Sequence, residues 1–398
     1  MMISLDPEQQ KVLVSWWVFM CAAGLSFVLV PVAKFVSRRF NIVDRPGNVR
    51  KFHDHDMPLL GGLAIYMAIA GTVLFNWFIL RPATAFPAIA SNFPDPIILA
   101  SGMSEVQGQL FGFGLGCTII LCIGLLDDIY GVDFPVGAKL LGQIAAAGVL
   151  MATGVRTSLF PGAMPGDIHN IVITLVWLVG FTNAFNLLDN MDGLCSGVAL
   201  IASSILAFIA IQSGQFFLSL LLCAFAGALL GFFRYNSYPS QIFLGDAGSL
   251  LIGYVMAAVV LLESFVTYGQ GSLLGVLMPV VILSLPLFDT VSVVIIRVRE
   301  NRPIYRGDRS HLSHRLVALG LREDQAVQVL YLLTFCLGIN ATLLSGCTTI
   351  QAVTVGVQGL GIVGLVAVLM NTGEDRTPGE PPKEPGGDAP HSVTSASE

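Results

Sequence analysis

Long apolar runs separated by short polar segments occupy the first 370 residues of the chain. A helix that crosses a membrane needs about 20 mostly apolar residues, and eleven runs come close to that length. The pattern predicts an all-α polytopic membrane protein, with residues 1–370 forming one domain of about 11 transmembrane helices. The expected spans are 12–33, 60–80, 108–126, 138–154, 169–188, 195–212, 215–233, 248–265, 272–296, 325–345 and 350–370.

Composition agrees with a chain that is embedded in lipid. Apolar residues make up 54% of the sequence and charged residues only 12%, whereas about 25% is usual for soluble proteins. These charges are too few to cover a soluble protein of this length, and no nucleic-acid partner is expected. Residues 371–398 are rich in Pro, Gly, Glu and Ser and are predicted to be a disordered cytoplasmic tail.

The lysines and arginines predict the orientation of the chain. With the N-terminus outside, all 20 of them except Lys11, Arg81 and Arg156 fall in segments that face the cytoplasm, as the positive-inside rule requires. The C-terminus is therefore expected in the cytoplasm. The same orientation places five unusual polar clusters on the cytoplasmic side.

The first and last of these clusters are basic. The first is the segment from Asp44 to His53, followed by Gly61-Gly62 at the start of a span, where a backbone can approach a ligand closely. The last is the segment 297–322, with seven arginines and the run His-Leu-Ser-His-Arg at 311–315. Arginine forks suit phosphate oxygens, but the need to set topology is an alternative explanation for both segments.

The second cluster is Asp127-Asp128, which ends the third span. Adjacent carboxylates repel each other unless they are separated or share a cation. Binding of Mg²⁺ beside a diphosphate, or proton transfer from an attacking phosphate, is a natural use for them, and solvated caps are the structural alternative. Lys139, at the start of the next span, can hold a phosphate as a point charge.

The third and fourth clusters carry further carboxylates and amides. The third runs from Asn183 to Leu194, and its polar residues lie between two apolar spans, where they are costly unless they bind something. The fourth, Phe243–Ser249, opens the eighth span. Its Asp246 is either an N-cap or a ligand for a cation beside an anion-binding helix end. Together the clusters suit phosphoryl transfer, which mostly needs positioning and charge neutralisation.

These motifs, in this order, resemble the polyprenyl-phosphate N-acetylhexosamine-1-phosphate transferases of the glycosyltransferase 4 type, from about Asp44 to Arg315. The resemblance implies transfer of a sugar 1-phosphate from a UDP-sugar to a polyprenyl phosphate, with release of UMP. It implies Mg²⁺, with Mn²⁺ as an alternative ion. The product would begin cell-wall or surface glycan synthesis at the cytoplasmic face of a bacterial cytoplasmic membrane, with undecaprenyl phosphate as the lipid.

Two branches of the family differ in the first and last cytoplasmic segments. The phospho-MurNAc-pentapeptide branch carries a Lys with a Thr-Pro-Thr-Met-Gly-Gly run, and adjacent histidines near the end. Here the first stretch, 54–62, has no such Lys, and the second reads His311-Leu312-Ser313-His314. Both differences favour the GlcNAc-1-phosphate branch. Phospho-MurNAc-pentapeptide transfer, or another UDP-N-acetylhexosamine as donor, is the alternative.

The resemblance also implies roles for individual residues. The catalytic residues would be Asp127, Asp128 and Asp246, and the metal ligands Asp246 and Asn186. The substrate-binding residues would be Lys51, His53, Lys139, Asn183, Asp189, Asp192, His311, His314 and Arg315. One departure is Asn190, where the family usually has Gly; if the position needs a positive φ, Asn is the best-tolerated replacement.

Two mechanisms and two other function classes stay open at this level. The lipid phosphate attacks the UDP-sugar directly, or an aspartyl-phosphate forms first. A secondary transporter would place its polar residues near the bilayer midplane between repeated halves, and neither feature occurs here. A catalytically inactive relative would have lost motif carboxylates, which are all present. A homodimer is a further possibility.

Overall fold

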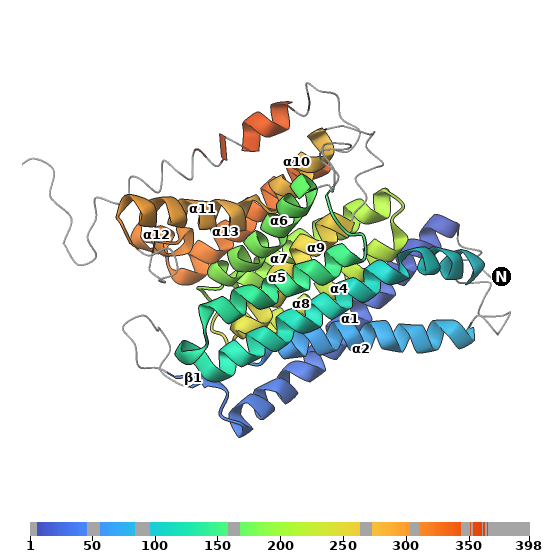
Figure 1. Ribbon diagram of the computed structural model, residues 1–398, viewed down its shortest axis with the longest axis horizontal. Coiled ribbons are helices and arrows are strands. Elements are labelled where there is room, and N and C mark those ends of the chain that lie inside the picture. The colour runs from blue at the N-terminus through green and yellow to red at the C-terminus, as the bar shows by residue number, and fades with distance from the viewer. Residues whose placement is uncertain are drawn as a thin grey trace, which may run out of the picture.

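The computed structural model describes residues 6–45, 56–83, 96–157, 168–262, 273–302 and 310–343, with parts of 351–364. These residues are helical almost throughout, and the helices lie side by side in one bundle (Figure 1). The helices are α1 (Pro7–Arg39), α2 (Gly61–Ala83), α4 (Pro96–Tyr130), α5 (Val136–Ala152), α6 (Ile168–Leu188), α7 (Leu194–Gln212), α8 (Phe216–Asn236), α9 (Gly245–Leu262), α10 (Leu273–Ile282), α11 (Ser284–Arg299), α12 (Leu312–Ala318) and α13 (Glu323–Thr342). A 3₁₀ turn, η1 (Gly131–Asp133), follows α4.

Among the described helices, 7 are long and apolar enough to cross a membrane: α1, α4, α6, α7, α8, α9 and α13. α2 and α5 contain shorter apolar stretches. This confirms the class of all-α polytopic membrane protein. The eleventh predicted span, 350–370, is helical at the residues described there, and the rest of it lies outside the described residues together with the tail 371–398.

The ninth predicted span, 272–296, is interrupted. α10 ends at Ile282, and α11 begins at Ser284 after Leu283. Pro286 explains the break, because its ring displaces the carbonyl four residues earlier, that of Ile282, and it has no N–H to donate. The predicted span is therefore made of two helical segments, α10 and α11.

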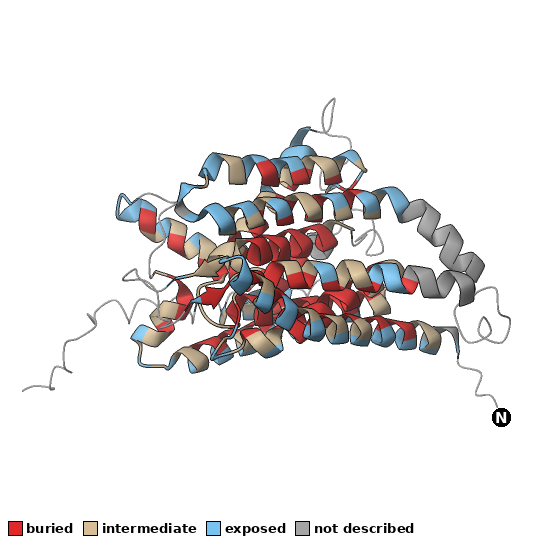
Figure 2. Ribbon diagram, turned by 90° about the horizontal axis from the view of Figure 1, so that it is seen from below, coloured by how far each residue is buried: buried red, intermediate tan, exposed pale blue. Residues whose placement is uncertain are grey.

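α9 lies at the centre of the bundle, where it packs against α2, α4 and α6. Every residue from Ala247 to Val260 is buried, as expected for a helix that is apolar on all sides. Figure 2 shows buried residues concentrated in the middle helices and exposed ones on the outward faces. On α1 the outward face carries Trp16, Phe27 and Phe35, which are suited to contact with lipid.

A two-stranded antiparallel sheet was not predicted. β1 (Val43–Asp44) pairs with β2 (Met57–Pro58), with Val43 opposite Pro58. The Phe243 amide donates to the Pro58 carbonyl at 2.9 Å, so this hairpin is tied to the segment that leads into α9. β1 and α12 lie at the end of the bundle opposite the N-terminus (Figure 1).

Candidate active site

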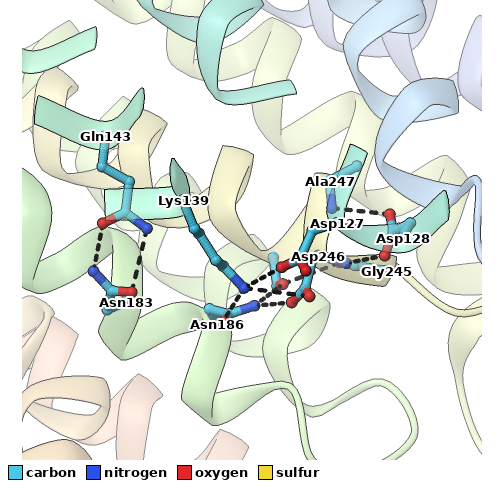
Figure 3. Close-up of polar contacts among 10 residues, drawn as sticks. Asp127, Asp128, Lys139, Gln143, Asn183, Asn186, Gly245, Asp246 and Ala247 are labelled. Atoms are coloured by element: carbon cyan, nitrogen blue, oxygen red, sulfur yellow. Dashed lines mark hydrogen bonds and ion pairs between the residues drawn. The ribbon is translucent and has the colours of Figure 1, made fainter. Parts of the chain in front are cut away.

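Four helices bring a ring of oxygen atoms around one ammonium group (Figure 3). Lys139 Nζ, on α5, lies 2.6 Å from Asp127 Oδ2 on α4 and 3.2 Å from Asp246 Oδ2 on α9. It also donates to Asn186 Oδ1 on α6 at 3.4 Å. The structure therefore brings together four of the predicted site residues, although they are far apart in the sequence.

The amide of Asn186 has a fixed orientation. Its Nδ2 donates to Asp246 Oδ1 at 2.5 Å and to Ser249 Oγ at 2.8 Å, while its Oδ1 accepts from Lys139. The Ser249 hydroxyl in turn donates to the Gly245 carbonyl at 3.0 Å. The oxygen of Asn186 therefore points to the same place as the carboxylates of Asp127 and Asp246.

Asp128 has a different environment from its neighbour. Its Oδ1 accepts from the Asp246 amide at 2.7 Å, and its Oδ2 accepts from the Ala247 amide at 3.1 Å. These amides belong to the first turn of α9, whose N–H groups have no partner within the helix. Asp128 therefore caps α9 from α4 and holds the backbone of Asp246 in place.

Glycines allow this close contact with α9. A Cβ atom on Gly62, in α2, would overlap the backbone of Gly248, and one on Gly124, in α4, would overlap the backbone of Ala247. The sequence suggested that Gly61-Gly62 let a ligand approach. In the described structure their close neighbours belong instead to α9 and to the residues before it, together with a Phe232 ring.

Asn183 lies one turn before Asn186 but joins a different contact. It exchanges two hydrogen bonds with Gln143 on α5, of 2.6 and 3.2 Å, and Figure 3 shows this pair beside the Lys139 cluster. Gln143 lies one turn after Lys139, so the amide pair fixes α5 against α6 at the level where Lys139 meets Asn186. The predicted role of Asn183 in substrate binding stays a prediction.

The loop between α6 and α7 carries two further aspartates. Asp192 accepts from the amide and the hydroxyl of Ser240, both at 2.9 Å, and so anchors the segment before α9. The carboxyl group of Asp189 forms no hydrogen bond within the described part of the chain. Burial, together with the negative charges of Asp246 and Asp192, raises the pKa of Asp189 to about 8. Its carboxyl group remains available for a ligand.

Comparison with known proteins identifies the family. The family model for glycosyl transferase family 4 matches residues 110–264, a range that contains the carboxylates of α4 and α9 and the loop after α6. A "Probable undecaprenyl-phosphate N-acetylglucosaminyl 1-phosphate transferase" of Bacillus subtilis (strain 168) is 32% identical over 349 residues, which cover 86% of this chain and 88% of that protein. The chain belongs to glycosyl transferase family 4.

Two other relatives come from other bacteria. A "Decaprenyl-phosphate N-acetylglucosaminephosphotransferase" of Mycolicibacterium smegmatis is 29% identical to this family 4 member, over 88% of this chain and 86% of its own length. An "Undecaprenyl-phosphate alpha-N-acetylglucosaminyl 1-phosphate transferase" of Escherichia coli (strain K12) is 26% identical, over 74% of each chain. The similarity therefore extends well beyond the part matched by the family model.

Asn190 does not occupy a left-handed conformation in this family 4 member. The non-glycine residues with positive φ in the described structure are Asn41 and Asn301, so the condition under which Asn would replace a family Gly is not met. Asn190 uses its side chain instead. Its Nδ2 donates to the Leu187 carbonyl at 3.1 Å, and its Oδ1 accepts from Ser313 Oγ at 2.6 Å. The loop after α6 is thereby joined to α12.

The last basic segment reaches this loop through α12. His311 immediately precedes α12 and is buried, while His314 and Arg315 are half-buried in its first turns. His311 Nδ1 lies 2.8 Å from Oδ2 of Asp289 on α11. Sequence analysis missed Asp289, although an ionisable residue inside an apolar span is itself a signal of function. Lys51 and His53 lie outside the described residues.

The residues around Lys139 fit a magnesium ion. Their donors are oxygen atoms of two carboxylates and one amide, the atom type that Mg²⁺ prefers. Among the described residues, no group of three His, Cys, Asp or Glu side chains is arranged to hold a metal by itself. Mg²⁺ commonly uses one or two carboxylates and completes its shell with water and substrate phosphates, and the arrangement in this family member suits that mode.

Proposed function

We propose that this protein transfers GlcNAc-1-phosphate from UDP-GlcNAc to undecaprenyl phosphate and releases UMP. The reaction would begin the synthesis of a cell-wall or surface glycan. The family membership and the activities named for its relatives support the proposal. The observation that carries it is the convergence of Asp127, Asp246 and Asn186 on Lys139 at one end of an apolar bundle.

This arrangement matches the needs of the two substrates. A polyprenyl acceptor enters from the lipid, so its phosphate reaches the protein at a membrane boundary. The diphosphate of a UDP-sugar needs positive charge, which Lys139 supplies directly. Mg²⁺ bound through Asp246 and Asn186 would neutralise further charge on the diphosphate and on departing UMP.

The proposed step is a direct displacement. The Asp127 carboxylate accepts the proton from the phosphate monoester of the lipid. The freed phosphate oxygen attacks the β-phosphorus of UDP-GlcNAc, and the bond between that phosphorus and the bridging oxygen breaks. UMP leaves with the electron pair, and the GlcNAc-phosphate remains on the lipid as a diphosphate. Lys139, which already contacts Asp127 and Asp246, stays close to both reacting phosphates.

Asp128 has a supporting role in this scheme. Because both of its carboxylate oxygens accept from amides of α9, it holds Asp246 rather than taking a proton from the lipid. Asp189, whose carboxyl group has no hydrogen-bond partner in the described structure, is assigned to the UDP-sugar. His311, His314 and Arg315 are assigned to its diphosphate or sugar.

The proposed topology has eleven spans in a bacterial cytoplasmic membrane, with the N-terminus outside and the C-terminus and the active site on the cytoplasmic side. The distribution of lysines and arginines supports it. A green fluorescent protein fused to the C-terminus should fluoresce, because it folds in the cytoplasm. An alkaline phosphatase fused at the same point should be inactive, and the reverse pattern would refute this orientation.

The reaction is tested with the purified full-length protein in detergent. We expect label from radioactive UDP-GlcNAc to enter undecaprenyl phosphate, with one UMP released per labelled lipid. EDTA should abolish transfer and added Mg²⁺ should restore it. Asp127→Asn should lower the rate by at least about 100-fold, whereas Asp133→Asn, on the exposed turn η1, should not.

Donor and acceptor panels separate the alternatives. Transfer only from UDP-MurNAc-pentapeptide, or only from another UDP-N-acetylhexosamine, would keep the class of reaction and change the substrate. Failure with every donor would refute the proposed function. Direct displacement is tested by incubating the enzyme with UDP-GlcNAc in the absence of lipid. A burst that releases one UMP per enzyme molecule would show a covalent intermediate instead.

A further inference from the structure

Asp289 is a buried carboxylate to which the proposed reaction assigns no role. It lies on α11 and is only 1% exposed. Its Oδ2 contacts His311 Nδ1 at 2.8 Å, and its Oδ1 accepts from the Leu312 amide at 2.7 Å. A carboxylate in such a place is costly unless its oxygens are paired. Here both oxygens are paired with the segment that begins α12.

This contact defines the state of the His311 ring. A carboxylate only accepts hydrogen bonds, so the proton of the contact lies on Nδ1 and the other ring nitrogen, Nε2, is left to interact elsewhere. The same carboxylate fixes the backbone at Leu312. Asp289 therefore sets both the ring state of His311 and the start of the helix that carries His314 and Arg315.

A second contact ties this segment to the candidate active site. Ser313 Oγ donates to Asn190 Oδ1 at 2.6 Å, and Asn190 is the neighbour of Asp189. α12 is thus held from α11 on one side and from the loop after α6 on the other. An error in the orientation of α12 would therefore be transmitted to the place where Asp189 lies.

We propose that Asp289 is a positioning residue for the transfer reaction, which fixes the ring state of His311 and the first turn of α12 against the UDP-sugar. This inference rests on the proposed function, in which His311 contacts the sugar or its diphosphate. Asp289 acts through His311 and touches no substrate atom itself. Removing the charge of Asp289 should therefore slow transfer in the same way as a wrong orientation of the His311 ring.

The variant Asp289→Asn tests this with little change in shape. The amide oxygen of the variant can still accept from the Leu312 amide. Its NH₂ group, however, donates toward His311, so Nδ1 must become an acceptor and the ring proton moves to Nε2. We expect an unfolding midpoint near that of the wild type and a fall in kcat of about 10- to 100-fold, with a smaller change in KM. Asp324→Asn, in a surface ion pair with Arg322 on α13, is the matched control and should behave as wild type.

A double-mutant cycle separates positioning from general stabilisation. We expect the double variant Asp289→Asn/His311→Ala to be no slower than His311→Ala alone. Wild-type kinetics in Asp289→Asn, wild-type kinetics in His311→Ala, or losses that multiply in the double variant would each overturn the proposal. Such results would leave the transfer reaction itself standing, because that reaction is measured in the wild type.

Spectroscopy of the ring gives a readout that needs no activity. In full-length protein labelled with ¹⁵N-histidine, the signals of His311 are those lost in His311→Ala. Nδ1 should be protonated in the wild type and unprotonated in Asp289→Asn. An unprotonated Nδ1 in the wild type would overturn the proposal, even if Asp289→Asn fails to fold. Failure of the wild type to transfer any sugar phosphate would count against the proposed function, and the ring state would still be measurable.

Discussion

At the scale of single residues, the adjacent carboxylates of Asp127 and Asp128 have separate surroundings. Asp127 is paired with Lys139, whereas Asp128 accepts from two amides of α9. Neighbouring positions on a helix point about 100° apart, so one side chain reaches the site and the other reaches the adjacent helix. The two residues should therefore fail in different ways when they are changed.

We expect Asp127→Asn to lose activity without losing stability, because Lys139 keeps its ion pair with Asp246. Asp128→Ala should lower the stability by about 1–3 kcal/mol, since two buried amides lose their acceptor. Thermal unfolding in detergent and transfer rates of both variants measure this difference. An Asp128→Ala protein as stable as the wild type would show that the cap has no energetic role.

The carboxyl group of Asp189 should make the metal-free protein sensitive to pH. Its pKa is about 8 in the folded protein and about 3.9 in an unfolded chain. Between these values the unfolded state releases a proton that the folded state keeps, so stability falls as the pH rises and levels off above about 8. Asp189→Asn should lack this loss.

The measurement is the difference in unfolding midpoint between wild type and Asp189→Asn, in EDTA, from pH 5 to pH 9. The wild type should lose stability relative to the variant up to about pH 8. A difference that does not change with pH would mean that Asp189 ionises in the folded protein as it does in water.

At the scale of elements, the N-terminus of α9 is held by its neighbours. Gly62 of α2 and Gly124 of α4 let those helices touch its backbone, and Asp128 caps it. In a membrane, where lipid is as apolar as the helix faces, small residues and hydrogen bonds provide much of the contact between helices. These contacts explain how Asp246 is held in place at the start of α9.

Gly124→Ala should disrupt this contact, because its methyl group would overlap the backbone of Ala247. We expect the free energy of unfolding to fall by about 1–3 kcal/mol and the transfer rate to be lower. Gly114→Ala, on the same helix, meets nothing within 4 Å and should be neutral or slightly stabilising. Equal behaviour of the two variants, in thermal unfolding and in transfer, would contradict the close approach of α4 to α9.

At the scale of the whole molecule, the candidate site joins four helices that are separate in the sequence. Asp127, Lys139, Asn186 and Asp246 come from α4, α5, α6 and α9. The pair between Gln143 and Asn183 fixes two of these helices at the same level. A ligand that engages all four helices should therefore stabilise the bundle as a unit.

Mg²⁺ with UMP, the proposed product, should raise the unfolding midpoint of the detergent-solubilised protein. At a ligand concentration 100 times Kd, binding should raise the free energy of unfolding by about 2.7 kcal/mol. EDTA should remove the shift, and Asp246→Asn should not show it, while Asp133→Asn should. If the unfolding midpoint of the wild type did not change at any concentration of Mg²⁺ and UMP, that result would argue against a metal site formed by these helices.

The membrane class, most of the spans and the principal carboxylates could be predicted from the sequence. Apolar runs of about 20 residues are long enough to cross a membrane and therefore predict spanning helices. Carboxylates next to such runs are easily noticed, because an ionised group is costly within a membrane. Asp289 was missed because it stands alone within the predicted span 272–296, and Gln143 because a single amide in an apolar run looks incidental. The hairpin of β1 and β2 has too few residues to leave a periodic pattern.

The sequence by itself determined the helical membrane class, the set of polar motifs and the family to which they point, because these depend on local composition and spacing. Only the tertiary structure decided which partner each polar group has. Asp128 meets α9, Asn183 meets Gln143, and Asp289 meets His311. These contacts depend on how closely the helices approach one another, and glycines on helices that are distant in the sequence allow that approach.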